Sequence, residues 1–309
     1  MISYLKNSEN SGLTVLENWQ EKCWINITSP SQEEVDYILN ELKVPSDFFY
    51  DIQDDDERPR IENEDGWLLI IMRIPVSRDA SVPFITVPLG IVIKDDIIAS
   101  ICFHVNDVIQ DFILHTQRKS IYIDNNMNFL LRLFLSSSVW FQKYLKQINT
   151  NVRMAEKELE LSIKNEDLQT LLKIEKCLVY FITSLKGNNI LLSKLKNLKS
   201  LEESFDPDLL EDVEIELKQA IETTNVHSDI LSGTMNAYAS IISNNVNDIM
   251  KKLTSITVIL MIPTLVASIY GMNLYNYMEK TYYGFFVVIL ISLILALLGI
   301  LYLRKRKLF

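Results

Sequence analysis

The sequence is poor in the residues that build disulfide frameworks and metal clusters. It has three cysteines and three histidines in 309 residues. The cysteines are widely separated and odd in number, so they form neither a disulfide framework nor a metal-ligand pattern, which fits a reducing compartment. The histidines are isolated, and a lone histidine is more often a structural residue than a ligand. These residues are Cys23, Cys102, Cys177, His104, His115 and His227.

Two kinds of motif are also missing. The N-terminal stretch MISYLKNSEN has no basic start followed by an apolar segment, so no cleavable signal peptide is expected. The chain has no phosphate-binding G-x-x-x-x-G-K-[ST] loop, and no nucleophile–base pair stands out. An enzyme is therefore not expected, and neither is an organic cofactor.

Positive charge is scarce before residue 251. The whole chain carries −10, whereas seven basic residues against Glu279 give +6 from residue 251 onward, so residues 1–250 carry −16. A domain this acidic has no basic patch for nucleic acid. The seven basic residues are Lys251, Lys252, Lys280, Arg304, Lys305, Arg306 and Lys307.

Charge is absent from two long apolar runs near the C-terminus. The run at 285–303, FFVVILISLILALLGILYL, has 19 residues without charge or proline, enough at about 1.5 Å per residue to cross the apolar core of a bilayer. The run at 253–270 contains hydroxyl residues and Pro263, and beside a clear span it is expected to form the first arm of a membrane hairpin. Lysines before the first span and RKRK after the second place both chain termini on the cytoplasmic side of the cell (inner) membrane.

The first 120 residues alternate strand and helix signals. Strands are expected at 24–27, at 67–76 and as a hairpin over 89–103 that turns at Asp95-Asp96. A helix is expected over 29–42, with Ser29 or Ser31 as its N-cap. This pattern predicts an α/β domain that ends near residue 120.

The chain then becomes helical. Residues 125–186 contain neither glycine nor proline, and apolar residues recur there at helical spacing. Turns are expected at 165–167 and, more clearly, at Lys186-Gly187-Asn188-Asn189. A new helix is expected from Pro207, with Asp206 as its N-cap. If unbroken to Tyr270 it has 64 residues and a length of about 96 Å, so one rigid helix would run from the cytoplasmic domain across the membrane.

One face of this long helix carries a stripe of small, hydroxylated and apolar residues, which we call the polar stripe. Its members recur at steps of three or four and therefore share a face. The stripe suits either an ordinary helix–helix contact in the membrane or the lining of a pore. Two spans cannot enclose a pore alone, so the pore requires a homo-oligomer. The stripe consists of Asn247, Met250, Leu253, Thr257, Met261, Thr264 and Ser268, with Asn236, Ser240 and Ser243 extending it backward; Ile259, Ile262 and Val266 lie opposite and suit lipid or the second span.

The stretch IPTLVASIYGMN (262–273), the second span close behind it and the basic tail resemble the CorA family of divalent-metal transporters. The acidic N-terminal domain with ERPR at 57–60 and the long helix agree, so the resemblance covers the whole chain. It implies a funnel-shaped homopentamer that conducts Mg²⁺ and often Co²⁺ or Ni²⁺. Its fold would be an α/β cytoplasmic domain with a long helical stalk and two C-terminal transmembrane helices, and its partners would be its own copies, hydrated divalent cations and the lipid bilayer.

The resemblance also assigns roles to residues. Gly271, Met272 and Asn273 would form the outer mouth, the polar stripe would line the pore, and Met250 with Leu253 would be the constriction that closes it by excluding water. An intact Gly-Met-Asn favours Mg²⁺ over Zn²⁺. The following loop, LYNYMEKTYYGF, departs from the family's Met-Pro-Glu-Leu pattern.

The resemblance further implies regulation by Mg²⁺ bound between cytoplasmic domains. Counting back along the helix from the triplet favours Glu211 and Asp212 as ligands of this regulatory Mg²⁺. Other candidates are Asp206, Asp208 and the acidic run 54–57. The competing interpretation is that acidic residues favour helix N-termini and that a DDDE run is a solvated loop.

These patterns divide the chain into a cytoplasmic α/β domain, a helical hairpin region, a stalk, a first span, an external loop, a second span and a basic tail. The expected ranges are 1–120, 121–204, 205–252, 253–273, 274–284, 285–303 and 304–309. Two alternatives to a Mg²⁺ channel stay open: a Co²⁺, Ni²⁺ or Zn²⁺ transporter on the same scaffold, and a membrane-anchored scaffold or sensor that conducts nothing.

Overall fold

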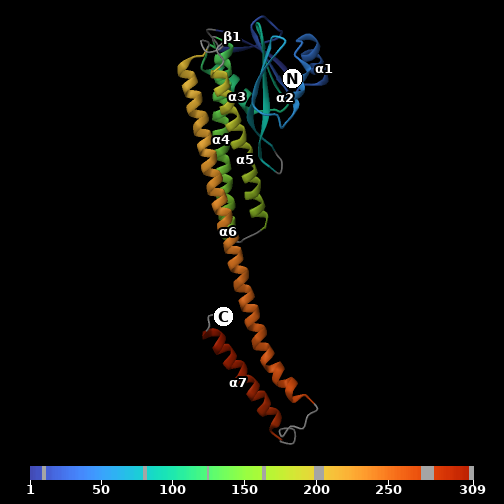
Figure 1. The fold of residues 1–309 in the computed structure, drawn as a ribbon, viewed down its shortest axis with the longest axis vertical. Coiled ribbons are helices and arrows are strands. Elements are labelled where there is room, and N and C mark those ends of the chain that lie inside the picture. Colours follow the sequence, from blue (N-terminus) through green and yellow to red (C-terminus); the bar gives the residue numbers. More distant parts are fainter. Residues whose placement is uncertain are drawn as a thin grey trace. The chain divides into compact units, whose positions relative to one another are not determined.

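The computed structural model describes residues 1–8, 12–78, 82–123, 125–161, 165–197, 205–272 and 282–305. The chain forms two compact units, Met1–Gly233 and Thr234–Phe309. The first holds a sheet covered by helices and the second consists mainly of two apolar helices (Figure 1).

Seven strands of the described residues form one sheet in the order β2-β1-β3-β7-β6-β5-β4. Neighbouring strands are antiparallel except β3 and β7, which run parallel. The strands are β1 Ile2–Ser8, β2 Gly12–Leu16, β3 Cys23–Thr28, β4 Arg60–Glu64, β5 Trp67–Ser77, β6 Phe84–Lys94 and β7 Ile97–Cys102.

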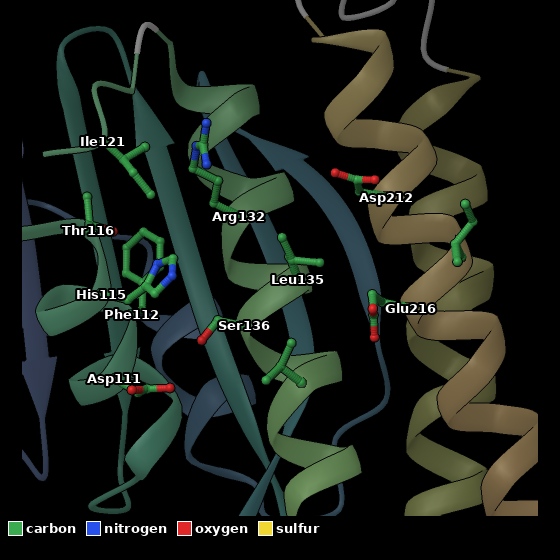
Figure 2. A pocket seen from close by; sticks show the side chains of 12 residues that line it. Asp111, Phe112, His115, Thr116, Ile121, Arg132, Leu135, Ser136, Asp212 and Glu216 are labelled. Carbon is green, nitrogen blue, oxygen red and sulfur yellow. The ribbon is translucent and has the colours of Figure 1, made fainter. Parts of the chain in front are cut away.

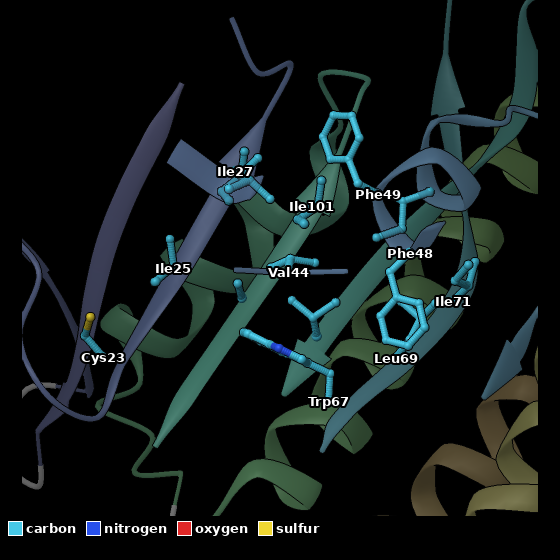
Figure 3. Close-up of a cluster of buried hydrophobic side chains, with 14 residues drawn as sticks. Cys23, Ile25, Ile27, Val44, Phe48, Phe49, Trp67, Leu69, Ile71 and Ile101 are labelled. Carbon is cyan, nitrogen blue, oxygen red and sulfur yellow. The ribbon is translucent and has the colours of Figure 1, made fainter. Parts of the chain in front are cut away.

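Helices cover both faces of the sheet, which is why β5 and β6 are apolar almost throughout. One core lies between the sheet and the segment formed by α1 Gln32–Asp36, the π-helical turn η1 Tyr37–Glu41 and α2 Ser46–Gln53. Figure 3 shows this core, in which Phe48 and Phe49 of α2 and Trp67 of β5 are buried. The other core lies beneath α3 Asp107–Arg118, α4 Asn126–Leu161 and α5 Asn165–Lys196.

Several predicted elements are confirmed. Strands cover 24–27 and 67–76, and the hairpin of β6 and β7 turns at Asp95-Asp96, where Asp95 has a φ of 48°. Ser31 is the N-cap of α1 and forms a capping box with Glu34. Strands β1, β2 and β4 form without having been predicted.

The predicted turn at Lys186, Gly187, Asn188 and Asn189 is wrong, because α5 continues through all four residues. Gly187 and Asn188 instead make contacts with residues that are distant in the sequence. A Cβ atom on Gly187 would lie 2.8 Å from Pro59 Cγ, so only glycine lets Pro59 lie this close to α5. The turn predicted at 165–167 is wrong, because these residues form the acidic first turn of α5, while α4 ends at Leu161.

The amide of Asn188 completes the hydrogen bonding of β5. Strand β4 begins at Arg60, opposite Ile71, so Arg73 lies beyond the paired segment. Asn188 Oδ1 accepts from the Arg73 N–H at 2.9 Å, and Asn188 Nδ2 donates to the Arg73 carbonyl at 2.7 Å. The Asn188 side chain therefore bonds the backbone groups of β5 that a longer β4 would otherwise have bonded. Strand β4 does not extend to this position, because Pro59 has no N–H to donate.

Helix α6 runs from Pro207 to Tyr270 as one helix of 64 residues, as predicted. Asp206 caps it by accepting from the Asp208 N–H at 3.0 Å, which also confirms the predicted cap. Within the first unit its apolar face is buried at Leu209, Val213, Leu217, Ala220 and Leu231. In the second unit it is followed by α7, Gly284–Lys305.

Candidate functional site

The second unit is a helical hairpin whose two arms meet through small and branched residues. Both helices are long and apolar enough to cross a membrane. The less exposed residues of α7 recur every three or four positions at Gly284, Val288, Ser292, Ala296, Gly299 and Leu303. A Cβ atom on Gly299 would lie 2.8 Å from Ile262 Cδ1, so glycine lets α7 approach α6 closely.

The matching face of α6 is formed by Ser255, Ile259, Ile262, Pro263 and Val266, which are less exposed than their neighbours. Of the two partners expected for Ile262, lipid or the second span, the structure shows the second span. At 3.6 residues per turn the polar stripe is centred roughly 180° away from this face.

The polar stripe is consequently exposed in the single chain. Met250, Leu253 and Met261 expose 53%, 56% and 63% of their surface, and Asn247, Thr257, Thr264 and Ser268 are exposed as well. The structure therefore brings all seven predicted residues onto one helix face whose centre is directed away from α7, although Asn247 and Met250 also line a pocket that reaches Leu303 of α7.

Two hydroxyl groups of the stripe have a defined polarity. Thr257 Oγ1 donates to the Leu253 carbonyl and Thr264 Oγ1 donates to the Leu260 carbonyl, each at 2.9 Å. Because each hydroxyl proton is used within the helix, the oxygen has only lone pairs left for an outside partner. The stripe thus presents hydrogen-bond acceptors between apolar side chains.

The stripe leads to the end of α6. The Gly271 N–H donates to the Ala267 carbonyl at 2.9 Å and the Met272 N–H to the Ile269 carbonyl at 3.4 Å, which closes the last turn. Asn273, the third residue of the triplet, and the atypical loop residues 274–281 lie outside the described residues. Exposed aromatic residues, Tyr282, Tyr283, Phe285 and Phe286, surround the start of α7, as is typical of a membrane interface.

The acidic residues at the head of α6 differ in what they contact. The Asp206 carboxylate caps the helix. Glu211 and Asp212 are exposed, and they form no ion pair within the residues that the structure describes. These two carboxylates are thus available to a cation from outside the chain.

Two carboxylates of the acidic run at 54–57 already have partners within the protein. Asp55 Oδ1 lies 2.6 Å from His104 Nε2, and Glu57 Oε1 lies 3.2 Å from Arg60 Nε. Arg73 Nη1 donates to the carbonyls of Asp55 and Glu57 at 2.8 and 2.7 Å. Burial lowers the pKa of the Arg73 guanidinium, an effect that the acidic run opposes.

No three His, Cys, Asp or Glu side chains come together as a metal cluster in the described part of the chain. The two groups of candidate regulatory ligands, at 211–212 and at 54–57, therefore do not form one site there. Their roles as metal ligands stay predictions.

A pocket of about 400 Å³ lies at the head of α6 and was not predicted from the sequence. Figure 2 shows Asp212 and Glu216 on the side of α6 that faces α4, with Arg132 and Leu135 on α4 and His115 on α3. The one signal of this pocket in the sequence is the spacing of Asp212 and Glu216, which lie four residues apart and therefore on the same face of α6. The other walls come from helices more than 70 positions earlier in the chain.

Within the described residues, Asp111 is the one carboxylate of this pocket that forms an ion pair. Partial burial opposes the ionisation of Asp111, but the charge and hydrogen bond of Lys143 at 2.8 Å, together with the Trp140 N–H at 3.0 Å, lower the pKa of its carboxyl. Arg132 Nε is buried and has no hydrogen-bond partner in the described residues.

Comparison with known proteins shows similarity along nearly the whole chain. The family model for the CorA-like Mg²⁺ transporter protein matches residues 19–305. The cobalt/magnesium transport protein CorA of Methanocaldococcus jannaschii is 25% identical over 289 residues, which cover 91% of this chain and 90% of that protein. The cobalt/magnesium transport protein CorA of Thermotoga maritima is 30% identical over 166 residues, or 53% of this chain and 47% of that protein.

The fold is shared as well. The complete structure of the CorA magnesium transporter from Methanocaldococcus jannaschii superposes with a TM-score of 0.81 at 22% identity, covering 99% of this chain and 98% of that one.

Proposed function

The chain belongs to the family of CorA-like Mg²⁺ transporter proteins, and from that premise we propose that it conducts Mg²⁺ into the cell through a pore lined by the polar stripe. The observation that carries the proposal is the position of the stripe, opposite the face of α6 that packs on α7. A face of acceptor oxygens and apolar side chains that the chain's own second span leaves uncovered suits the axis of an oligomer.

The pore requires several copies with α6 innermost, and we infer the homopentamer that the family resemblance implies. In this arrangement the cytoplasmic domains form the wide end of a funnel and α7 faces lipid. The basic residues Lys251, Lys252, Arg304 and Lys305 mark the cytoplasmic end of the hairpin. Both termini then lie in the cytoplasm of a cell whose inner membrane holds the protein.

The chemistry of the stripe fits a hydrated divalent cation. Mg²⁺ dehydrates reluctantly and keeps several waters when bound, so the groups that meet it contact water hydrogens. Thr257 and Thr264 present lone pairs and no donors, and therefore accept hydrogen bonds from the hydration shell without removing it. No acidic residue occurs at 249–278, which keeps binding weak enough for release.

The outer mouth is formed by Gly271, Met272 and Asn273, with the Asn273 amides as a ring of acceptors around hydrated Mg²⁺. The constriction is formed by Met250 and Leu253, whose apolar side chains exclude water when the copies are close together. An inside-negative potential drives uptake, since a divalent ion gains roughly 4.6 kcal/mol per 100 mV at about 2.3 kcal/mol per charge.

Regulation by cytoplasmic Mg²⁺ is the second part of the proposal. Glu211 and Asp212 are exposed and unpaired among the described residues, so Mg²⁺ bridging them to a neighbouring copy removes their repulsion and holds the pore shut. When Mg²⁺ falls, like charges separate the stalks. Asp212→Ala is expected to weaken the inhibition of flux by internal Mg²⁺, and unchanged inhibition would remove Asp212 from this role.

Flux into liposomes tests the pore. The purified protein is reconstituted with a Mg²⁺-sensitive dye inside, an inside-negative potential is imposed, and Mg²⁺, Co²⁺, Ni²⁺ and Zn²⁺ are compared. Asn273→Ala is expected to abolish uptake, whereas Asn245→Ala, an exposed residue of α6 outside the stripe, is expected to leave it unchanged. Absence of any cation flux would favour the non-conducting scaffold or sensor, and preference for Co²⁺, Ni²⁺ or Zn²⁺ would favour the alternative transporter.

A further inference from the structure

The pocket at the head of α6 has the dimensions and walls of a ligand site. Its volume of about 400 Å³ falls in the range of roughly 300–1,000 Å³ in which small-molecule and cofactor sites occur. Its walls come from three helices of the first unit, α3, α4 and α6 (Figure 2). Arg132 lies on α4, whereas Asp212 and Glu216 lie on α6, so the pocket has one basic and one acidic wall.

The basic wall is formed by Arg132, whose guanidinium is not used in an ion pair within the described residues. Arg132 Nε has no hydrogen-bond partner among the described residues, and Arg132 forms no ion pair there. The Arg132 side chain lines the pocket, so the accessible end of its guanidinium can donate to an acceptor oxygen of a bound ligand. Phosphate and carboxylate oxygens are the preferred partners of a guanidinium because they match its planar fork.

The acidic wall selects among such anions. Asp212 and Glu216 lie one turn apart and both face the pocket, so they repel a bare anion. They attract an anion that carries its own divalent cation, because Mg²⁺ is commonly held by one or two carboxylates together with the phosphates of a ligand. Opposite charges on the two walls therefore favour a magnesium-bound polyphosphate.

The remaining wall is apolar. Phe112, Leu135, Val139 and Ile215 line it, and Ile215 is 54% exposed although it is a large aliphatic residue. A polyphosphate alone would leave this surface in contact with water. A planar base attached to the polyphosphate would cover it.

We propose that this pocket binds the Mg²⁺ complex of a nucleoside triphosphate, with the phosphates on Arg132, the metal on Glu216 and Asp212, and the base on the apolar wall. The site lies wholly in the first unit and its occupation needs no pore. An experiment can therefore refute nucleotide binding at this pocket without refuting transport, and the reverse. Asp212 is shared with the regulatory proposal, so the test relies on Arg132 and Glu216.

Calorimetric titration of the full-length protein in detergent tests the site. ATP is titrated with Mg²⁺, ATP is titrated in EDTA, tripolyphosphate is titrated with Mg²⁺, and Mg²⁺ alone supplies the background. Binding of Mg²⁺·ATP, with at least tenfold weaker binding of the other two, is the expected result. No heat from Mg²⁺·ATP, or equal affinity for either of the other ligands, would overturn the assignment.

Variants locate the ligand. Arg132→Gln and Glu216→Gln are each expected to weaken Mg²⁺·ATP binding at least tenfold. Arg153→Gln on α4 and Glu222→Gln on α6, both at exposed positions, are the matched controls and are expected to leave it unchanged. Ile215→Glu keeps the test decisive if Arg132→Gln does not fold, because it adds a charge at an exposed position of the apolar wall. Unchanged affinity in Ile215→Glu or in Glu216→Gln would place the ligand elsewhere.

Discussion

Replacing Asn188 by alanine removes the side chain that completes the sheet beyond β4. Asn188 is 1% exposed, and its amide makes two hydrogen bonds to the backbone of Arg73. The variant leaves a backbone N–H and a carbonyl without partners inside the first unit. At about 1–3 kcal/mol for an unsatisfied buried group, with some relief from water, the expected loss of unfolding free energy is roughly 2–4 kcal/mol.

The Asn188→Ala substitution should also loosen the acidic run at 54–57. The Arg73 guanidinium holds the carbonyls of Asp55 and Glu57, and the Arg73 backbone is held by Asn188. At about 2–4 °C per kcal/mol for a unit of this size, the thermal midpoint should fall by roughly 5–15 °C. Amide hydrogen exchange should rise in peptides containing Arg73 and residues 54–59.

The assay is thermal unfolding and hydrogen exchange of the full-length protein in detergent. Asn189→Ala is the matched control, since Asn189 is the adjacent asparagine and is exposed. A midpoint shift equal to that of Asn189→Ala, or exchange at Arg73 that does not change, would refute the role given to the Asn188 amide.

Three other expectations concern the second unit and the stalk. Gly299→Leu should separate α6 from α7 and reduce the yield of folded protein, whereas Gly299→Ala should cost little because the obstructing Ile262 Cδ1 is the end of a flexible side chain; equal yields would contradict the close contact. Burial lowers the pKa of His227 below its usual 6.5, so the unfolded chain binds more protons and stability falls as the pH drops below 6.5. His227→Leu should remove that part of the pH dependence of the thermal midpoint, and an identical pH profile would count against it. Leu253→Ser should raise Mg²⁺ leak into liposomes at high internal Mg²⁺ if the constriction is apolar, and an unchanged leak would place the constriction elsewhere.

Local signals in the sequence predicted much of the fold. The strands at 24–27 and 67–76 are dense apolar runs, the Asp95-Asp96 turn separates two more, and Asp206-Pro207 starts the long helix. These features depend on neighbouring residues alone. Strands β1, β2 and β4 have weaker signals, because polar residues interrupt their apolar pattern and they lie toward the two ends of the sheet order.

Errors and omissions arose where distant contacts decide the structure. Gly187-Asn188 has the composition of a turn, yet Pro59 and Arg73, more than 110 positions earlier, keep it helical. The stripe on α6 was predicted from periodicity, and the structure adds that it lies opposite α7. The pocket of Arg132 and Glu216 has little local signature beyond the spacing of Asp212 and Glu216, because three separate helices form it.

The amide of Asn188 has a further consequence for how copies of the chain avoid one another. Beyond the start of β4, the backbone of β5 would otherwise present a free donor and acceptor to any extended segment, which is how sheets recruit strands from other molecules. Asn188 occupies this pair of groups from within the same chain. This stretch of β5 therefore offers no free backbone pair to a strand of another molecule, and strand addition is left to the edge strands β2 and β4.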